Sequence, residues 1–113
     1  MQVPTFLILA SLAGQARHGY GIVQAVAELS GGEVKLRPGT LYGALERLVE
    51  LGLIELDHEE SVEGRLRRYY RLTTDGAGAL GVEAERMRRH ADAAREQLRR
   101  RPGIVPGFSG GAA

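Results

Sequence analysis

The sequence predicts a mainly α-helical chain with one small β-hairpin, an α+β fold class, and three observations lead to this prediction. The stretch from Arg37 to Leu56 has the pattern of a turn, a short amphipathic helix, a glycine and a strand. A basic segment with the two-residue period of a strand follows at Arg65 to Thr73. The segment from about Asp75 to Arg101 then keeps a helical period. This order of elements is that of a winged helix-turn-helix with a long C-terminal helix.

Length and composition indicate one hydrophobic core. The chain has 113 residues, 43% of them hydrophobic, and no cysteine. The absence of cysteine excludes disulfides and thiolate metal sites, and it fits a reducing cytosol. We expect a winged helix-turn-helix domain over residues 1–73, a dimerisation helix over 74–101 and a disordered tail over 102–113.

The first helix is expected from Pro4 to Ala13, with Gly14 ending it. Its apolar run is too short to span a bilayer, and no positively charged segment precedes it, so we expect no membrane anchor and a cytoplasmic protein. The helix is apolar on nearly every side, which indicates burial on more than one face. Phe6 and Leu9 are therefore candidates for contact with a second subunit.

The second helix is expected from Gly19 to Leu29, after a loop from Gln15 to His18. Three apolar side chains at spacings of four and three residues predict its core face: Ile22, Val26 and Leu29. In the next segment, Glu33 to Leu36, apolar and charged residues alternate, which could form a small edge strand.

The third helix is expected to begin near Pro38 and to end before Gly52. Leu41, Leu45 and Leu48 have core spacing. The opposite face then presents Thr40, Gly43, Arg47 and Glu50, flanked by Tyr42 and Glu46. An exposed face of this kind on a helix that enters a turn is a plausible surface for reading a DNA groove.

The hairpin is expected to pair a strand from Leu53 to His58 with a return strand from Arg65 to Leu72. The connection from Glu59 to Gly64 has no clear two-residue turn signal. The period of two divides the return strand into two faces. One face carries Leu66, Arg68, Tyr70 and Leu72, and the other carries Arg65, Arg67, Tyr69 and Arg71.

Charge is unevenly distributed, although the net charge is only +1. Five acids and no Lys or Arg lie between Glu55 and Glu63, whereas four arginines and no acid lie between Gly64 and Thr73. Of the 15 basic residues, 14 are Arg. Arginine suits bidentate contacts with phosphate and guanine, although a general compositional bias toward Arg explains the count equally well.

The last helix is too long for so small a core. About 27 residues at 1.5 Å each give roughly 40 Å. Small or apolar residues recur at spacings of four and three, which is typical of a helix pair. This seam consists of Leu80, Ala84, Met87, Ala91, Ala94 and Leu98.

Taken together, these segments resemble the PadR family of bacterial transcription regulators. The resemblance covers about residues 3 to 100. Its pieces are the apolar first helix with Gly14, HGYGI at 18–22, PGTLYGALERL at 38–48, GLIE at 52–55, GRLRRYYRLT at 64–73, and Gly76. The short C-terminal part is similar to the family's short branch.

The resemblance implies a homodimer that binds an inverted-repeat operator in double-stranded DNA, usually as a repressor. Release by a small-molecule effector is a further implication. By position, residues 38–51 would be the recognition helix and residues 64–70 the wing. The expected DNA-binding residues are Tyr20, Pro38, Gly39, Thr40, Tyr42, Gly43, Arg47, Gly64, Arg65, Arg67 and Tyr69.

Two departures from the family pattern stand out. The expected wing tip carries Glu59, Glu60 and Glu63, which would repel phosphate. Either the wing contacts DNA through Gly64, Arg65 and Arg67 at its base, or the tip points away. The chain also has no Trp, whereas some relatives stack a flat ligand on a Trp of the last helix.

Each candidate residue has an alternative role. Arg47 could read guanine or pair with Glu46 or Glu50. Thr40 could contact DNA or cap its helix. Tyr20 and Tyr42 could bind phosphate or lie half-buried. Arg71 is expected to pair internally with Glu55 or Asp57, and Tyr70 is expected to be in the core.

Other classes of function fit less well. A winged helix used only to bind another protein is the alternative to a DNA-binding regulator. An enzyme is not expected, because the sequence has no recognisable catalytic set or phosphate loop. The three histidines have no ligand spacing, so we expect neither a metal nor a cofactor.

Overall fold

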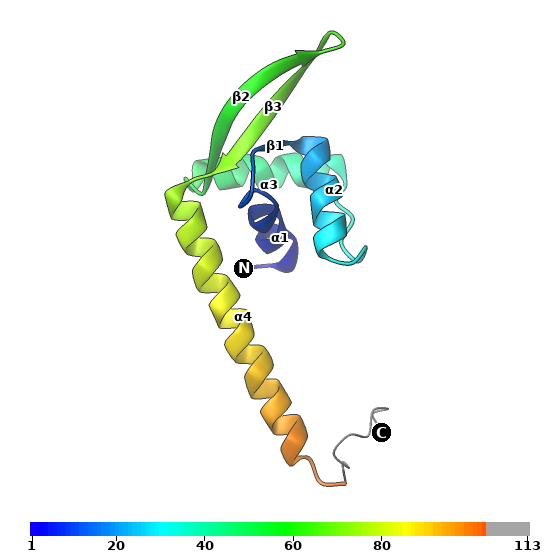
Figure 1. The fold of residues 1–113 in the computed structure, drawn as a ribbon, viewed down its shortest axis with the longest axis vertical. Helices are drawn as coiled ribbons and strands as arrows, with labels where there is room; N and C mark the ends of the chain where they lie inside the picture. Colours follow the sequence, from blue (N-terminus) through cyan, green and yellow to red (C-terminus); the bar gives the residue numbers. More distant parts are fainter. Residues whose placement is uncertain (104–113) are drawn as a thin grey trace. The chain divides into compact units, whose positions relative to one another are not determined.

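The computed structural model describes residues 1–103, and the expected tail lies largely outside these residues. Its helices are α1 (Val3–Ser11), α2 (Gly19–Leu29), α3 (Pro38–Glu50) and α4 (Thr74–Arg100), and its strands are β1 (Arg17–His18), β2 (Ile54–Val62) and β3 (Arg65–Leu72) (Figure 1). The chain divides into two compact units, Met1–Gly81 and Val82–Ala113. Helix α4 begins in the first unit and continues into the second.

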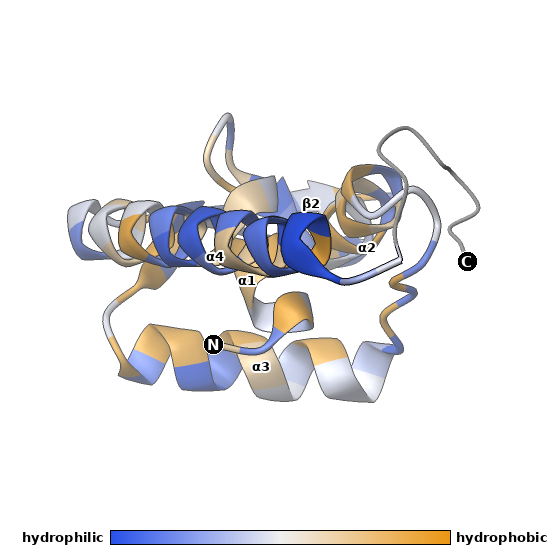
Figure 2. Ribbon diagram, turned by 90° about the horizontal axis from the view of Figure 1, so that it is seen from below, coloured by the Kyte–Doolittle hydropathy of each residue, from blue (hydrophilic) through white to orange (hydrophobic). Residues whose placement is uncertain are grey.

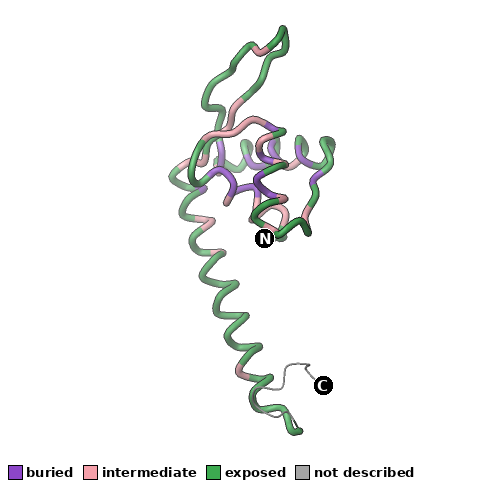
Figure 3. Tube along the Cα trace, turned by 45° about the vertical axis from the view of Figure 1, so that its right-hand side comes forward, coloured by how far each residue is buried: buried purple, intermediate pink, exposed green. Residues whose placement is uncertain are grey.

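The core of the first unit lies among α1, α2 and α3, with a contribution from the start of β2 (Figure 3). Its fully buried side chains include Ile8, Leu9, Ile22, Val26, Leu41, Leu45 and Ile54. The predicted core faces of α2 and α3 are confirmed except at Leu29. That side chain is 55% exposed because it lies in the last turn of α2, beyond the packed part of the helix.

Leu9 is fully buried in the core of the first unit. The expectation that it contacts a second subunit is therefore wrong for this structure, since its side chain offers no surface to a partner. Phe6 is partly exposed one turn earlier on α1. The apolar surface of α1 is thus largely buried against other helices of the same unit.

The three strands form one antiparallel sheet with the order β1-β3-β2. Arg17 and His18 form β1, opposite Tyr70 and Tyr69 of β3. The sequence predicted a loop here, because two residues are too few to show a strand period. The edge strand expected at residues 33–36 is absent, and the buried Leu36 instead packs into the core from irregular chain.

The hairpin of β2 and β3, hereafter the wing, is longer than predicted. Strand β2 continues to Val62, and a two-residue turn of Glu63 and Gly64 leads directly into β3. Both turn residues have positive φ, 51° and 77°, as a type I′ turn requires. The prediction failed because Glu, unlike Asn or Asp, is an uncommon first residue in such turns.

The base of the wing is tied to the ends of α3 and α4. Gly52 has a φ of 75° and follows α3, where the N–H of Leu53 bonds back to the carbonyl oxygen of Leu48 at 3.0 Å. The Thr73 hydroxyl donates to the Gly52 carbonyl at 2.7 Å and accepts the N–H of Gly76 at 2.9 Å. Thr73 thereby caps α4 and fixes where the wing ends.

In the second unit, the described part of α4 is a highly charged helix. Intrahelical ion pairs join Arg88 to Glu85 and Asp92, and Glu96 to Arg99 and Arg100. Such pairs at spacings of three and four residues stabilise an exposed helix by about 0.2–0.5 kcal/mol each. Within residues 1–103, no helix is long and apolar enough to cross a membrane.

Candidate nucleic-acid interface

Helix α3 presents a continuous exposed surface opposite its buried leucines. Pro38 occupies the first turn, and no side chain caps the helix start. Figure 2 shows hydropathy alternating around this helix, with apolar and polar residues on different sides. At Gly39 and Gly43, a side-chain carbon would meet nothing within 4 Å. These two positions are therefore open to an approaching molecule.

Thr40 and Arg47 are both exposed and lie on the side of α3 next to the start of α1. With apolar neighbours such as Leu51, they line a groove of about 640 Å³. Thr40 makes no capping hydrogen bond, and Arg47 forms no ion pair with Glu46 or Glu50 among the described residues. The alternative roles expected for these residues, a helix cap for Thr40 and an ion pair for Arg47, are thus not observed.

Two tyrosines, Tyr20 of α2 and Tyr42 of α3, lie on the other side of α3, toward the wing. Tyr20 is 66% exposed and Tyr42 is 58% exposed. The Tyr42 ring lies over Gly19, where even a single added carbon would come within 3.0 Å of the Tyr42 hydroxyl oxygen. Gly19 therefore leaves the space that holds Tyr42 beside the start of α2.

A groove of about 710 Å³ separates these tyrosines from the wing; we name it the basic groove. Arg65, Arg67 and Arg68 of β3 line its far wall, together with Leu66 and Tyr70. Among the described residues, no ion pair involves Arg65 or Arg67, whereas Arg68 bonds Glu59 at 3.1 Å. Two guanidinium groups without an ion pair and two exposed tyrosines thus line the same groove, a set of donors that suits phosphate oxygens.

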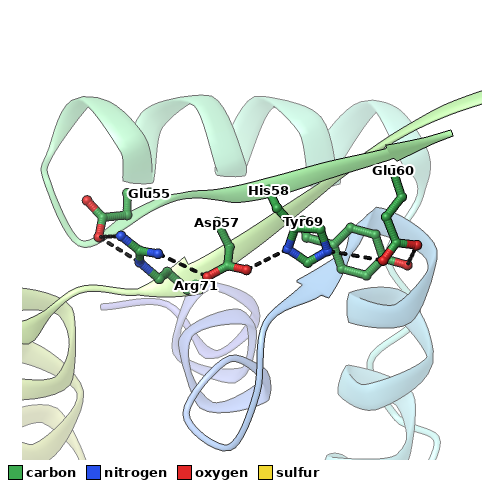
Figure 4. A network of polar contacts seen from close by, with 6 residues as sticks. All are labelled: Glu55, Asp57, His58, Glu60, Tyr69 and Arg71. Carbon is green, nitrogen blue, oxygen red and sulfur yellow. Dashed lines mark hydrogen bonds and ion pairs between the residues drawn. The ribbon is translucent and has the colours of Figure 1, made fainter.

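Arg71 lies on the same face of β3 as Arg65 and Arg67, and it is paired, as predicted. Its guanidinium bonds Glu55 at 2.8 Å and Asp57 at 3.0 Å (Figure 4). Tyr70 packs, partly buried, against the core, which agrees with its predicted place. Arg71 is thus held by its neighbours on β2, whereas Arg65 and Arg67 on the same face have no ion pair among the described residues.

Tyr69 was expected to be an exposed DNA-binding residue, but it is half-buried among its neighbours on the sheet. Its ring stacks on His58 and lies 5.1 Å from the His18 ring. Its hydroxyl donates to Glu60 at 3.4 Å (Figure 4). These contacts, which come from β1 and β2, give Tyr69 a structural position at the base of the wing.

The prediction that Glu59, Glu60 and Glu63 form the wing tip is wrong for the first two. Glu59 and Glu60 lie within β2, opposite Arg68 and Arg67. Only Glu63 is in the turn, beside Gly64. The longer hairpin is the reason, because extending β2 moves these side chains from the loop into the strand.

A second groove, of about 460 Å³, continues between α3 and the wing toward the end of α3; we name it the acidic groove. Glu46, Glu50 and Glu59 line it, and its one lining arginine, Arg68, is held by Glu59. The space between α3 and the wing is therefore basic at one end and acidic at the other. A polyanion is attracted to the first end and repelled from the second.

Two histidines of the sheet, His18 in β1 and His58 in β2, have opposite electrostatic surroundings. Burial, followed by the nearby charge of Arg67, lowers the pKa of His18. A 2.5 Å hydrogen bond to Asp57 is the main cause that raises the pKa of His58. No group of three or more His, Cys, Asp or Glu within residues 1–103 is arranged to hold a metal ion.

The predicted seam of α4 runs along an exposed face of the second unit, except for its first residue. Leu80 lies in the first unit and packs partly buried against the core. Met87 is 36% exposed and Leu98 is 55% exposed. The three alanines of the seam, Ala84, Ala91 and Ala94, are exposed between them. A surface of this kind is available to a partner helix.

The three-helix core and its β-wing define a winged-helix protein. A model of the PadR-like family of transcriptional regulators matches residues 8–82. The chain therefore belongs to this family, and the expected fold and family are confirmed. The expectation that the chain is not an enzyme fits a family of transcriptional regulators.

Individual relatives agree with this assignment. A transcriptional regulator of Mycobacterium tuberculosis is 41% identical over 73 residues, which are 65% of this chain and 64% of that protein. A PadR family regulator of Clostridium difficile has a TM-score of 0.73 at 26% identity, covering 86% of this chain and 99% of that one. PadR of Bacillus subtilis, solved in complex with operator DNA, shares the fold with a TM-score of 0.62 at 20% identity, covering 95% and 53%.

Proposed function

We propose that this chain is a sequence-specific, double-stranded DNA-binding transcriptional regulator. One observation carries the proposal: the exposed face of α3 adjoins the basic groove, where Tyr20, Tyr42, Arg65 and Arg67 present unpaired donors. Phosphate contacts position a protein on DNA, and a helix in the major groove reads the bases. The DNA complex of the Bacillus subtilis relative supports the same use of the fold.

The DNA backbone would run through the basic groove and avoid the acidic groove. The tyrosine hydroxyls and the arginines would bind successive phosphates from opposite walls. Helix α3 would then lie in the adjacent major groove, with Gly39 and Gly43 allowing close approach and Arg47 contacting guanine from the side next to α1. Gly64 allows the tight turn at the wing tip, and Pro38 starts the reading helix.

We further propose that the protein acts as a homodimer on an inverted repeat. The exposed part of the α4 seam, from Ala84 to Leu98, supports this because an isolated helix leaves such a face in water. Leu80 and Phe6, both partly exposed, would border the interface. Repression and release by a small-molecule effector follow the family pattern, and a cytoplasmic location follows from contact with chromosomal DNA.

Selection from a randomised double-stranded DNA library tests this function. We expect an enriched sequence with two symmetric half-sites, because a two-fold dimer presents two α3 helices. Recovery of no common sequence, with binding that salt abolishes equally for all DNA, would contradict sequence-specific regulation. That result would favour a winged helix that binds a protein partner.

A further inference from the structure

The outermost stripe of α3 consists of Gly39, Gly43, Glu46 and Glu50. Gly39, Gly43 and Glu46 each stand two residues before a buried leucine of the same helix (Leu41, Leu45 and Leu48). Two residues correspond to about 200° around an α-helix, so these positions point directly away from the core. Glycine has no side chain, so Glu46 carries the first side chain of this stripe.

Glu46 is exposed and makes no ion pair or side-chain hydrogen bond among the described residues. An unpaired carboxylate on a DNA-reading helix is unfavourable near phosphate, since both groups are negative. The acidic groove strengthens this effect because Glu50 and Glu59 lie along the same side. Glu46 must therefore either stay away from DNA or meet a hydrogen-bond donor on a base.

The two glycines favour the second outcome. They bring the helix backbone close to the bases at Gly39 and Gly43, and Glu46 follows less than one turn later on the same stripe. A carboxylate accepts hydrogen bonds and cannot donate them. In the major groove, the base donors are the amino groups of cytosine and adenine, and adenine places the N7 acceptor beside its amino group. Cytosine is the better partner for a carboxylate.

We infer that Glu46 is a specificity-determining residue that selects a cytosine in each operator half-site. This inference rests on the proposed DNA-binding function. It assigns the carboxylate a role in choosing the sequence, while the arginines of the wing contribute affinity that does not depend on sequence. Glu46 would also disfavour other bases, because an acceptor at that position leaves the carboxylate without a donor.

The test compares the unsubstituted protein with Glu46→Ala, Glu46→Gln and Glu28→Ala in selection from the same randomised library. Glu28 is exposed on α2 and makes no ion pair or side-chain hydrogen bond among the described residues, so its variant removes one negative charge without altering α3. Thermal unfolding verifies that each variant is folded. Competition binding with the selected DNA then gives affinities for all four base pairs at each position.

We expect Glu46→Ala to lose preference at one symmetric pair of positions and to bind the selected DNA about five-fold or more weakly. Glu46→Gln should move that preference toward adenine, because Gln pairs bidentately with adenine. Glu28→Ala should keep the original sequence. These three results together support the role of Glu46.

Stronger binding of Glu46→Ala to every sequence would overturn the inference, since it would place the carboxylate near phosphates. An unchanged sequence preference would overturn it as well. In both cases the unsubstituted protein still selects a sequence, so the proposed function survives. Failure of the unsubstituted protein to select any sequence would overturn both proposals.

Discussion

Tyr69 and His58 stack across the wing, with ring centroids 4.4 Å apart and an interplanar angle of 11°. His58 is held in this position by Asp57 at 2.5 Å and Glu60 at 3.2 Å. The His18 ring approaches Tyr69 as well, at 5.1 Å. The stack therefore joins β1, β2 and β3 at the base of the wing. The pKa values of the two histidines depend on the charges around it.

The two histidines should titrate on opposite sides of 6.5, their ordinary pKa. His58 should have the higher pKa because Asp57 bonds its protonated ring, and His18 the lower one because it is buried near Arg67. Nuclear magnetic resonance of the two imidazole rings measures both values. Asp57→Asn should lower the pKa of His58 and leave that of His18 nearly unchanged; the opposite order of the two values would contradict the structure.

The stability of the wing should depend on pH through the same pair. A group with a raised pKa contributes stability below its ordinary pKa and loses it as pH rises through the folded value. The pKa of Asp57 is lowered, chiefly by the His58 hydrogen bond, so its contribution is lost as pH falls. The pair should therefore stabilise most between the ordinary values of 3.8 and 6.5. Denaturant unfolding of the parent and Asp57→Asn should differ most in that range.

Gly76→Ala should destabilise the first unit. A side-chain carbon at Gly76 would overlap the carbonyl oxygen of Leu53 and crowd Leu72 at 2.8 Å. Overpacking of this kind costs about 1–3 kcal/mol, and backbone overlap falls at the upper end. Gly78→Ala is the matched control, because it meets nothing within 4 Å and should stabilise α4 by about 1 kcal/mol or less. Equal unfolding midpoints for both variants would disprove the close contact.

Gly43→Ala should separate stability from DNA binding. The open surroundings of Gly43 allow the substitution, and alanine should stabilise α3 by about 0.5–1 kcal/mol. If DNA approaches the helix backbone there, the same methyl group should weaken operator binding. Unfolding and anisotropy measurements on one preparation give both quantities. A variant that is more stable and binds DNA unchanged would show that DNA does not approach Gly43.

Arg47→Ala and Arg65→Ala should weaken DNA binding in different ways. Loss of a base contact at Arg47 should lower specific binding by about 1–3 kcal/mol and relax sequence preference. Loss of a phosphate contact at Arg65 should weaken binding to all sequences and reduce the salt slope by about one. Equal losses from both substitutions on every sequence would contradict the base-reading role of Arg47.

Met87→Glu or Leu98→Glu should produce monomers. Each substitution would place a charge in an apolar helix interface, where burial of an unpaired carboxylate is unfavourable. Sedimentation equilibrium measures the association state, and Arg89→Glu on the opposite side of the same helix is the control. A dimer that persists in both seam variants would mean that the subunits associate through another surface.

Much of the fold could be predicted from periodicity. The bounds of α2 and β3 agree with the prediction, and α3 and α4 agree to within a residue at most of their ends. These elements have long runs of period 3.6 or 2, so local pattern and burial coincide. The two-residue strand β1 has no such signal, because it forms only through tertiary pairing with β3. The turn at Glu63 has none either, because it depends on a left-handed backbone conformation that Glu rarely adopts.

The residues of the candidate site could be predicted from the sequence, but their arrangement in one groove could not. The pattern identified Tyr20, Tyr42, Arg65 and Arg67, yet it could not show that they share one groove, since that depends on how the wing packs beside α2 and α3. The burial of Leu9 and the stacking of Tyr69 were missed for the same reason. The division into basic and acidic grooves also depends on three-dimensional packing, because Glu59 is distant in sequence from Glu46.

Sequence-specific binding of DNA by a dimer is tested most directly by fluorescence anisotropy with the DNA upstream of the protein's own gene. Unrelated DNA of equal length, at several salt concentrations, is the reference. The proposed function predicts tight binding to the upstream DNA alone, saturating at two chains per site. Equally weak and salt-sensitive binding to both DNAs would contradict specific regulation at that site.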